Sequence, residues 1–235
     1  MMVFYFIYLD MLNLMEELLL LALDDKKGKV LLSSSTELPY ALRGAVLLEL
    51  VIAKKIDIVN KKVVLIDPTM TGNPILNNAL ELIENKSKEK SIGYWISRLG
   101  YKMKSLRKDL LSGLMNKGIL EKVDGKILWL IPTKKYPTKN PIPENEVRKR
   151  IIDIVLHDKH PDERSLMLIS LVNSCKLVKE IFSKEYRKEA KKKIKEIIKN
   201  ESFGKEVTSQ VNNEIMSAVT AQIIIMSVAS SSSTS

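Results

Sequence analysis

Apolar residues recur every three or four positions through most of this 235-residue chain, the spacing that places them on one face of a helix. Between residues 103 and 117, for example, Leu106, Leu110 and Leu114 share a face, and Gly118 follows where such a helix would end. The pattern predicts helices at 13–23, 41–54, 75–85, 91–99, 103–117, 147–156, 165–178, 179–200 and 206–228.

Two segments change to the alternating period of a strand. Residues 54–67 alternate on both sides of an Asn-Lys pair at 60–61, which predicts a β-hairpin. A second hairpin is predicted over residues 119–131, with Asp124-Gly125 as its two-residue turn and with prolines stopping the second strand after Ile131. Short strands among many helices indicate a mainly α fold.

The order of these segments predicts a single compact helical bundle domain with a few short β-hairpins, spanning residues 12–229. Residues 1–11 are interpreted as an N-terminal extension and the serine-rich residues 230–235 as a disordered tail. A proline-rich connector at 132–146 joins the second hairpin to the last group of helices.

The apolar N-terminus raises the question of a signal peptide or a membrane anchor. Asp10, Glu16 and Glu17 interrupt it, no basic segment precedes it, and no small-residue cleavage site follows. A spanning helix needs about 20 mainly apolar residues. We therefore expect an amphipathic helix of the core here, with both glutamates on its polar face, and a cytoplasmic protein.

The chain carries 38 Lys and Arg against 28 Asp and Glu, a formal net charge of +10. Such an excess points either to an acidic partner, which could be nucleic acid, phospholipid headgroups or an acidic protein, or only to a solvated surface. Cys175 is the only cysteine, which excludes an intramolecular disulfide and fits a reducing compartment. Its apolar neighbours predict a core residue.

No pattern of catalytic or cofactor-binding residues emerges. The glycine-rich phosphate-binding motifs are absent. His157 and His160 lie three apart beside acidic residues, but no third His or Cys ligand is in sight, so no metal site is predicted. The sequence therefore predicts no enzyme, no cofactor and no metal.

Two interpretations of the basic segment before residue 117 stay open. In the first, residues 94–131 form a winged helix that binds nucleic acid through the basic helix. In the second, Lys104 and Arg107 project from one helix face and hold a single phosphate group, joined in the folded protein by Arg43 from another helix. The cations gather at one end of the helix, and Asp109 follows them, which favours a point phosphate site and makes nucleic acid the weaker choice.

Six segments, in order, resemble the Golgi phosphoprotein 3 family of phosphatidylinositol 4-phosphate effectors. They are MEELLLLALDDKKGKV, YALRGAVLLELVIAKKI, TGNPILNNALELI, YWISRLG, LRKDLLSGLMNKGIL with the hairpin after it, and PDERSLMLISLVNSCKLV. The likeness covers about residues 12–228. The short N-terminus and the LIPTKKYP connector resemble the compact members found in prokaryotes.

The resemblance implies a peripheral membrane protein that binds phosphatidylinositol 4-phosphate, or a similar anionic phospholipid headgroup, through a basic pocket. It also implies an adaptor in the trafficking or retention of membrane proteins, with cytoplasmic tails of membrane enzymes as partners and, in a eukaryote, the cytosolic face of the Golgi as its location. An apolar hairpin of the family inserts into membrane or supports self-association as a homo-oligomer, and here that hairpin is Ile127, Leu128, Trp129 and Leu130.

Residue by residue, the pocket arginine of the family falls on Arg43, and its arginine pair falls on Lys104 and Arg107. A lysine in place of one arginine keeps the charge but not the planar bidentate fork. The pocket tryptophan of the family falls on Ser33 or Ser34, depending on the side from which the loop is aligned. Either serine could donate to a phosphate, but neither supplies an aromatic wall.

Overall fold

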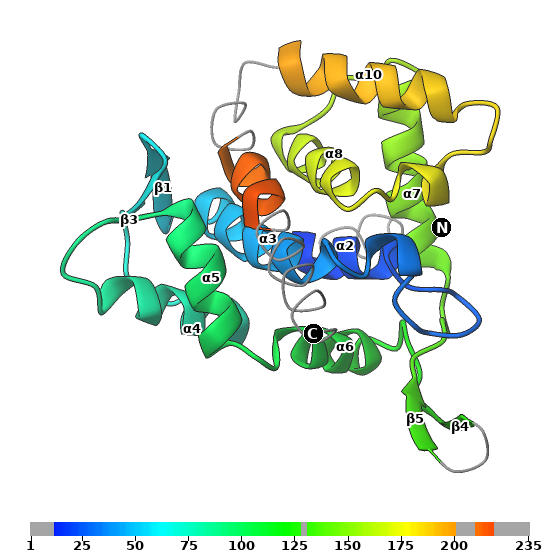
Figure 1. Cartoon of the computed structure of the whole chain (residues 1–235), viewed down its shortest axis with the longest axis horizontal. Helices are drawn as coiled ribbons and strands as arrows, with labels where there is room; N and C mark the ends of the chain where they lie inside the picture. Colours follow the sequence, from blue (N-terminus) through cyan, green and yellow to red (C-terminus); the bar gives the residue numbers. More distant parts are fainter. Residues whose placement is uncertain (1–11, 128–130, 201–209, 219–235) are drawn as a thin grey trace, which may run out of the picture.

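The computed structural model describes residues 12–127, 131–200 and 210–218, and the fold is mainly α, as the sequence predicts. Figure 1 shows two central helices, α2 and α3, with α7, α8 and α10 on one side and α4, α5 and α6 on the other. The helices are α2 (Leu14–Leu21), α3 (Leu38–Ile52), α4 (Pro74–Glu84), α5 (Ile92–Lys102), α6 (Leu106–Asn116), α7 (Ile142–Leu156), α8 (Glu163–Ser174), α9 (Val178–Ile181) and α10 (Arg187–Asn200), with a 3-10 turn, η1 (Leu32–Ser34).

The two central helices form the middle of the core because most of their side chains are buried. All eight residues of α2 are buried, and so are ten of the fifteen in α3. The helical residues 210–218 pack closely on α3 at Gly44, where a Cβ would lie 2.6 Å from Cδ1 of Ile215. A larger side chain at this position would push the two helices apart.

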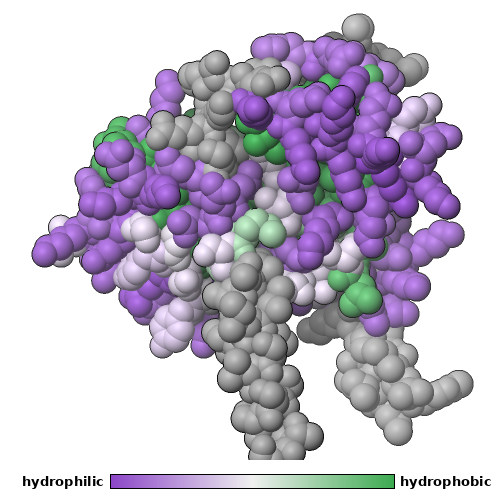
Figure 2. Space-filling model, turned by 45° about the horizontal axis from the view of Figure 1, so that its top comes forward, coloured by the Kyte–Doolittle hydropathy of each residue, from purple (hydrophilic) through white to green (hydrophobic). Residues whose placement is uncertain are grey.

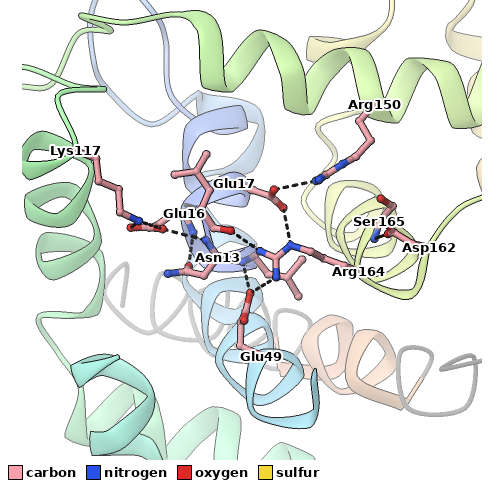
Figure 3. Close-up of polar contacts among 11 residues, drawn as sticks. Asn13, Glu16, Glu17, Glu49, Lys117, Arg150, Asp162, Arg164 and Ser165 are labelled. Carbon is pink, nitrogen blue, oxygen red and sulfur yellow. Dashed lines mark hydrogen bonds and ion pairs between the residues drawn. The ribbon is translucent and has the colours of Figure 1, made fainter. Parts of the chain in front are cut away.

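The expectation that Glu16 and Glu17 face solvent is wrong. Glu17 is 0% exposed, and its carboxylate accepts a hydrogen bond of 2.9 Å from the Arg150 guanidinium of α7. Glu16 forms an ion pair of 2.6 Å with Lys117. The guanidinium of Arg164 on α8 lies between two buried carboxylates, 3.8 Å from Glu17 and 3.0 Å from Glu49 of α3 (Figure 3).

These buried ion pairs fix α2 against α7, α8 and the end of α6. Burial raises the pKa of Glu17, and the two arginines oppose that rise. A buried carboxylate is tolerated only when cations compensate for its lost hydration. The helical pattern could not reveal this arrangement, because the compensating cations come from α7, α8 and the end of α6.

The first predicted hairpin is confirmed. Strands β1 (Ile56–Val59) and β2 (Lys62–Leu65) pair antiparallel, and the Asn60-Lys61 turn has both residues at positive φ, 50° and 62°. A third strand, β3 (Lys90–Ser91), pairs with β2 to complete a small sheet. The sequence does not predict β3, because its two residues lie in a charged linker with no alternating pattern.

The second hairpin exists, but its predicted register is wrong. Strand β4 (Val123–Ile127) pairs with β5 (Ile131–Lys135), so Asp124 and Gly125 lie within a strand and pair with Lys134 and Thr133. Ile119 and Leu120 are buried in the core instead of starting the strand. Their burial moves the hairpin about four residues along the chain.

Several helix boundaries also differ from the prediction. Helix α7 begins five residues early, at Ile142, because Pro143 suits a first helical turn. The predicted 165–178 helix ends at Ser174, and Lys176 follows with φ of 58°. The predicted 179–200 helix is divided into α9 and α10. The extension at 1–11 and the tail at 230–235 lie outside the described residues.

Candidate functional site

A cavity of about 250 Å³ opens where the start of α3, the end of α5 and the start of α6 meet. Its apolar wall includes Leu38, Leu42 and Leu106, and we call it the cation cavity because Arg43, Lys104 and Arg107 also line it. Arg43 is far in the sequence from Lys104 and Arg107, and packing of α3 against α5 brings it to them. The structure thus places all three predicted cations around one cavity.

Arg43 lies on α3 and is half-buried in the cavity wall. Its Cζ atom lies 5.0 Å from the centroid of the Tyr40 ring, within the range of a cation–π contact. A Cβ on Gly100 would lie 2.5 Å from the same Cζ, so the guanidinium lies directly on the backbone of α5. Burial lowers the pKa of Arg43, but an arginine stays charged at neutral pH.

Lys104 does not lie on a helix with Arg107, contrary to the prediction. Helix α6 begins at Leu106, so Lys104 belongs to the turn between α5 and α6, and Arg107 is in the first helical turn. Lys104 Nζ lies 5.3 Å from the centroid of the Tyr101 ring. Lys104 and Arg107 therefore reach the cavity from a turn and from the first turn of α6, and not from one shared helix face as predicted.

Carboxylates do not neutralise this site. Within residues 12–127, 131–200 and 210–218, no Asp or Glu oxygen lies within 4.0 Å of the side-chain nitrogens of Arg43, Lys104 or Arg107. Most other arginines here have carboxylate or carbonyl partners; Arg148 and Arg150, for example, pair with buried glutamates. Three uncompensated cations around one apolar cavity form a site suited to an anion with several oxygens.

The two predicted serines lie elsewhere. The Ser34 hydroxyl is buried and donates to the Leu31 carbonyl at 3.2 Å. Ser33 donates to Glu180 Oε1 at 3.0 Å and lines a different cavity. Ser35 lines the cation cavity instead. The turn η1 rotates successive side chains away from one another, and this local conformation could not be read from a run of three serines.

Sequence reasoning also missed Tyr40, Tyr101 and Gly100. Each lies within three residues of a predicted cation or of the α5–α6 turn, so proximity in sequence was the one available signal. The predicted membrane or self-association hairpin falls mostly outside the described residues: Leu128, Trp129 and Leu130 are not described, and Ile127 is described only as the end of β4.

The second interpretation, a groove-binding helix, has little support in α6. Arg107 and Lys108 are exposed in its first turn, but the next cation along the segment, Lys117, is paired with the buried Glu16. Leu110, Leu111 and Leu114 face the core. A positive surface along the length of the helix is therefore absent from α6.

Residues with metal-ligating side chains do not gather in the described part of the chain: no cluster of three or more His, Cys, Asp or Glu has a suitable arrangement there. His157 lies 3.2 Å from Asp153, an ordinary contact one helical turn apart. Cys175 is buried, as expected, and burial raises the pKa of its thiol. Among the described helices none has the length and apolar character to cross a bilayer.

Comparison with known proteins gives a consistent result. The family model described as Golgi phosphoprotein 3 (GPP34) matches residues 14–216. Vacuolar protein sorting-associated protein 74 of Schizosaccharomyces pombe is 30% identical over 165 residues, which are 61% of this chain and 48% of that protein. The protein of the same name from Eremothecium gossypii is 27% identical over 166 residues, 62% of this chain and 49% of its own length. The chain spans about half the length of these curated relatives.

Proposed function

This chain belongs to the Golgi phosphoprotein 3 family, and from that premise we propose that it is a peripheral membrane protein that binds phosphorylated phospholipid headgroups. The preferred ligand is phosphatidylinositol 4-phosphate or a similar anionic headgroup with a phosphomonoester. Arg43, Lys104 and Arg107 bind that phosphate in the cation cavity. The proposal assigns no catalytic residue, metal or cofactor.

The observation that carries this proposal is that three cations converge on one cavity with no carboxylate partner in the described part of the chain. Half-buried Arg43 loses hydration, and the cation–π contact with Tyr40 does not replace the charge of a carboxylate. A phosphate in the cavity would replace that hydration with charge-assisted hydrogen bonds, and Arg43 and Arg107 can each supply two parallel donors. A cavity of about 250 Å³ has room for one phosphate and part of an inositol ring.

The relatives are named for vacuolar protein sorting. We extend the proposal accordingly to an adaptor that works in sorting or retention of membrane proteins at the cytosolic face of a Golgi-type membrane. Its partners would be the anionic membrane and cytoplasmic tails of membrane enzymes. Self-association through the hairpin around Trp129 stays a prediction, because that hairpin tip lies outside the described residues.

Flotation with phosphatidylcholine vesicles that contain phosphatidylinositol 4-phosphate tests the proposal. The Arg43→Ala/Arg107→Ala variant should lose about tenfold or more in affinity, because each charge-assisted hydrogen bond contributes about 1.5–3 kcal/mol. Lys102→Ala/Lys108→Ala is the matched control. It removes the same charge from exposed neighbouring positions that do not line the cavity.

Equal binding by the wild type and the arginine variant would reject the cavity as the headgroup site. An equal loss of affinity in the arginine variant and in its lysine control would show that net charge, and not the cavity, determines binding. A gel-shift series with duplex DNA gives an independent comparison, since nucleic-acid binding would be strong at low salt and fall steeply as salt rises.

A further inference from the structure

A second, larger cavity borders the same short turn as the first. It measures about 450 Å³, and its wall comes from η1, the ends of α8 and α9, and α10. Ser33 lines this cavity, whereas Ser35, two residues on, lines the cation cavity. We call it the lysine cavity because four lysines line it: Lys176, Lys179, Lys191 and Lys195.

The lysines exceed the carboxylates around this cavity. Lys176 pairs with Glu37 at 2.5 Å, and Lys179 lies 3.7 Å from Glu180. Lys191 and Lys195 have no ion pair among the residues the structure describes. They lie four apart on α10, so both amino groups project from the same helix face. Four positive charges against two negative ones leave this cavity positive.

The surrounding backbone is held firmly by arginines. Arg187 donates to the carbonyls of Lys179 and Phe182, at 2.7 Å and 3.1 Å. Arg148 of α7 donates to the Glu180 carbonyl at 2.8 Å. These bonds fix the short helix α9 relative to α7 and α10. The lysines from α9 and α10 therefore line one cavity of fixed shape. Lysines along a single isolated helix would not enclose such a space.

An exposed leucine lies in η1, the turn that borders both cavities. Leu32 is 92% exposed at the start of η1, directly before Ser33. Hydrophilic residues cover most of the face that includes α10, as Figure 2 shows. An exposed apolar side chain in a turn that borders two cation-lined cavities matches a bilayer surface, where acyl chains lie just below phosphates. A soluble anion would offer nothing to Leu32.

We propose that the lysine cavity is a second phosphate-binding site, which takes the headgroup of another anionic phospholipid while the cation cavity holds the first. Lysine is a compact point charge without the planar fork of arginine, so this site recognises a phosphate by charge and discriminates little among headgroups. Two headgroups bound in separate cavities also fix the orientation of the protein on the bilayer. The proposal rests on the proposed function in that both cavities meet the same membrane.

The experiment measures binding to phosphatidylcholine vesicles that contain phosphatidylserine but no phosphomonoester lipid. The Lys191→Gln/Lys195→Gln variant should bind about tenfold more weakly than the wild type, given the attraction of each lysine near an anionic surface. Lys188→Gln/Lys192→Gln is the matched control, because it removes the same charge at the same spacing from exposed positions of α10 outside the cavity. The control should lose much less.

Equal loss in both variants would overturn the site, since net charge would then explain the effect. Unchanged binding in the Lys191→Gln/Lys195→Gln variant would overturn it as well. Inorganic phosphate, titrated into the vesicle-free protein and followed by the amide resonances of Lys176 and Lys179, distinguishes a free anion from a lipid. If phosphate shifts these resonances saturably and the Lys191→Gln/Lys195→Gln variant still binds vesicles as the wild type does, the cavity binds a soluble phosphate. That result would overturn the assignment of a lipid headgroup to this cavity.

The two proposals fail separately. Arg43→Ala/Arg107→Ala tested on phosphatidylinositol 4-phosphate vesicles reports on the first cavity. The lysine variant tested on phosphatidylserine vesicles reports on the second. Loss only in the lysine experiment would retain the second site without the first, and loss only in the arginine experiment would do the reverse.

Discussion

The guanidinium of Arg43 lies on the backbone of Gly100, so close that a Cβ at position 100 would come within 2.5 Å of Cζ and Nη1. This contact joins α3 to the last turn of α5 and determines where one of the three cations points. A glycine is required here by the space the guanidinium occupies. Its φ is not positive, so the backbone itself would accept alanine.

Gly100→Ala should therefore weaken headgroup binding without harming the fold. The added methyl displaces the flexible end of Arg43, which we expect to cost about tenfold in affinity for phosphatidylinositol 4-phosphate vesicles. Stability should change by no more than about 1 kcal/mol, because alanine favours the helix over glycine. Ser97→Ala, at an exposed position one turn earlier on α5, is the control. A variant that binds as well as Ser97→Ala would show that the guanidinium position is unimportant.

Lys104→Arg should strengthen binding of the phosphomonoester. Lys104 lines the cavity without a carboxylate partner in the described part of the chain, and an arginine there would add a planar pair of donors. We expect a gain of about threefold to tenfold in affinity for soluble inositol 1,4-bisphosphate, measured by calorimetry. Lys108→Arg is the control, since Lys108 is exposed and outside the cavity lining. A decrease in affinity would mean that the turn has no room for the larger side chain.

Leu32→Ser should reduce binding to anionic vesicles and leave stability nearly unchanged. The side chain is 92% exposed, so the folded protein loses almost no packing, whereas insertion of a leucine into the bilayer contributes about 1–2 kcal/mol. Met70→Ser is a close control, because Met70 is 81% exposed and lies in the loop before α4 instead of in η1. Similar effects of the two substitutions would place Leu32 outside the membrane contact.

Glu144 should make stability depend on pH. Burial raises the pKa of this carboxyl to about 7, against 4.5 for an unperturbed group; Arg148 lowers it and Asp25 adds to the rise. The folded protein then binds a proton more tightly than the unfolded chain, so the stability that protonated Glu144 confers is lost as the pH rises from about 4.5 to about 7. Relative to Glu144→Gln, wild type should lose up to about 3 kcal/mol over this range.

Urea unfolding of wild type and Glu144→Gln at about pH 5 and about pH 8 measures this difference. Glu121→Gln is the control, because Glu121 is exposed. An equal pH dependence in wild type and Glu144→Gln would contradict the assigned cause. The Arg148–Glu144 ion pair, at 2.6 Å, stabilises the charged carboxylate and so works against the predicted loss.

The helical period alone determined the mainly α fold and the approximate position of most helices, because the apolar faces of amphipathic helices repeat regularly. It failed where burial was complete. On α2 every residue is buried, so the polar positions Glu16 and Glu17 could not be recognised as paired interior charges. The prediction of a strand also failed at Ile119 and Leu120, because these two residues are buried in the helical core.

Charge, spacing and the resemblance to a family singled out Arg43, Lys104 and Arg107, and their convergence was a hypothesis that local patterns could not test. The tertiary structure decided it, because only the packing of α3 on α5 brings residue 43 to residues 104 and 107. It likewise assigned Ser33 and Ser35 to different cavities. Periodicity specifies which face of an element is buried, whereas a site depends on distances between elements, which are set by side-chain packing and buried ion pairs distributed over the whole chain.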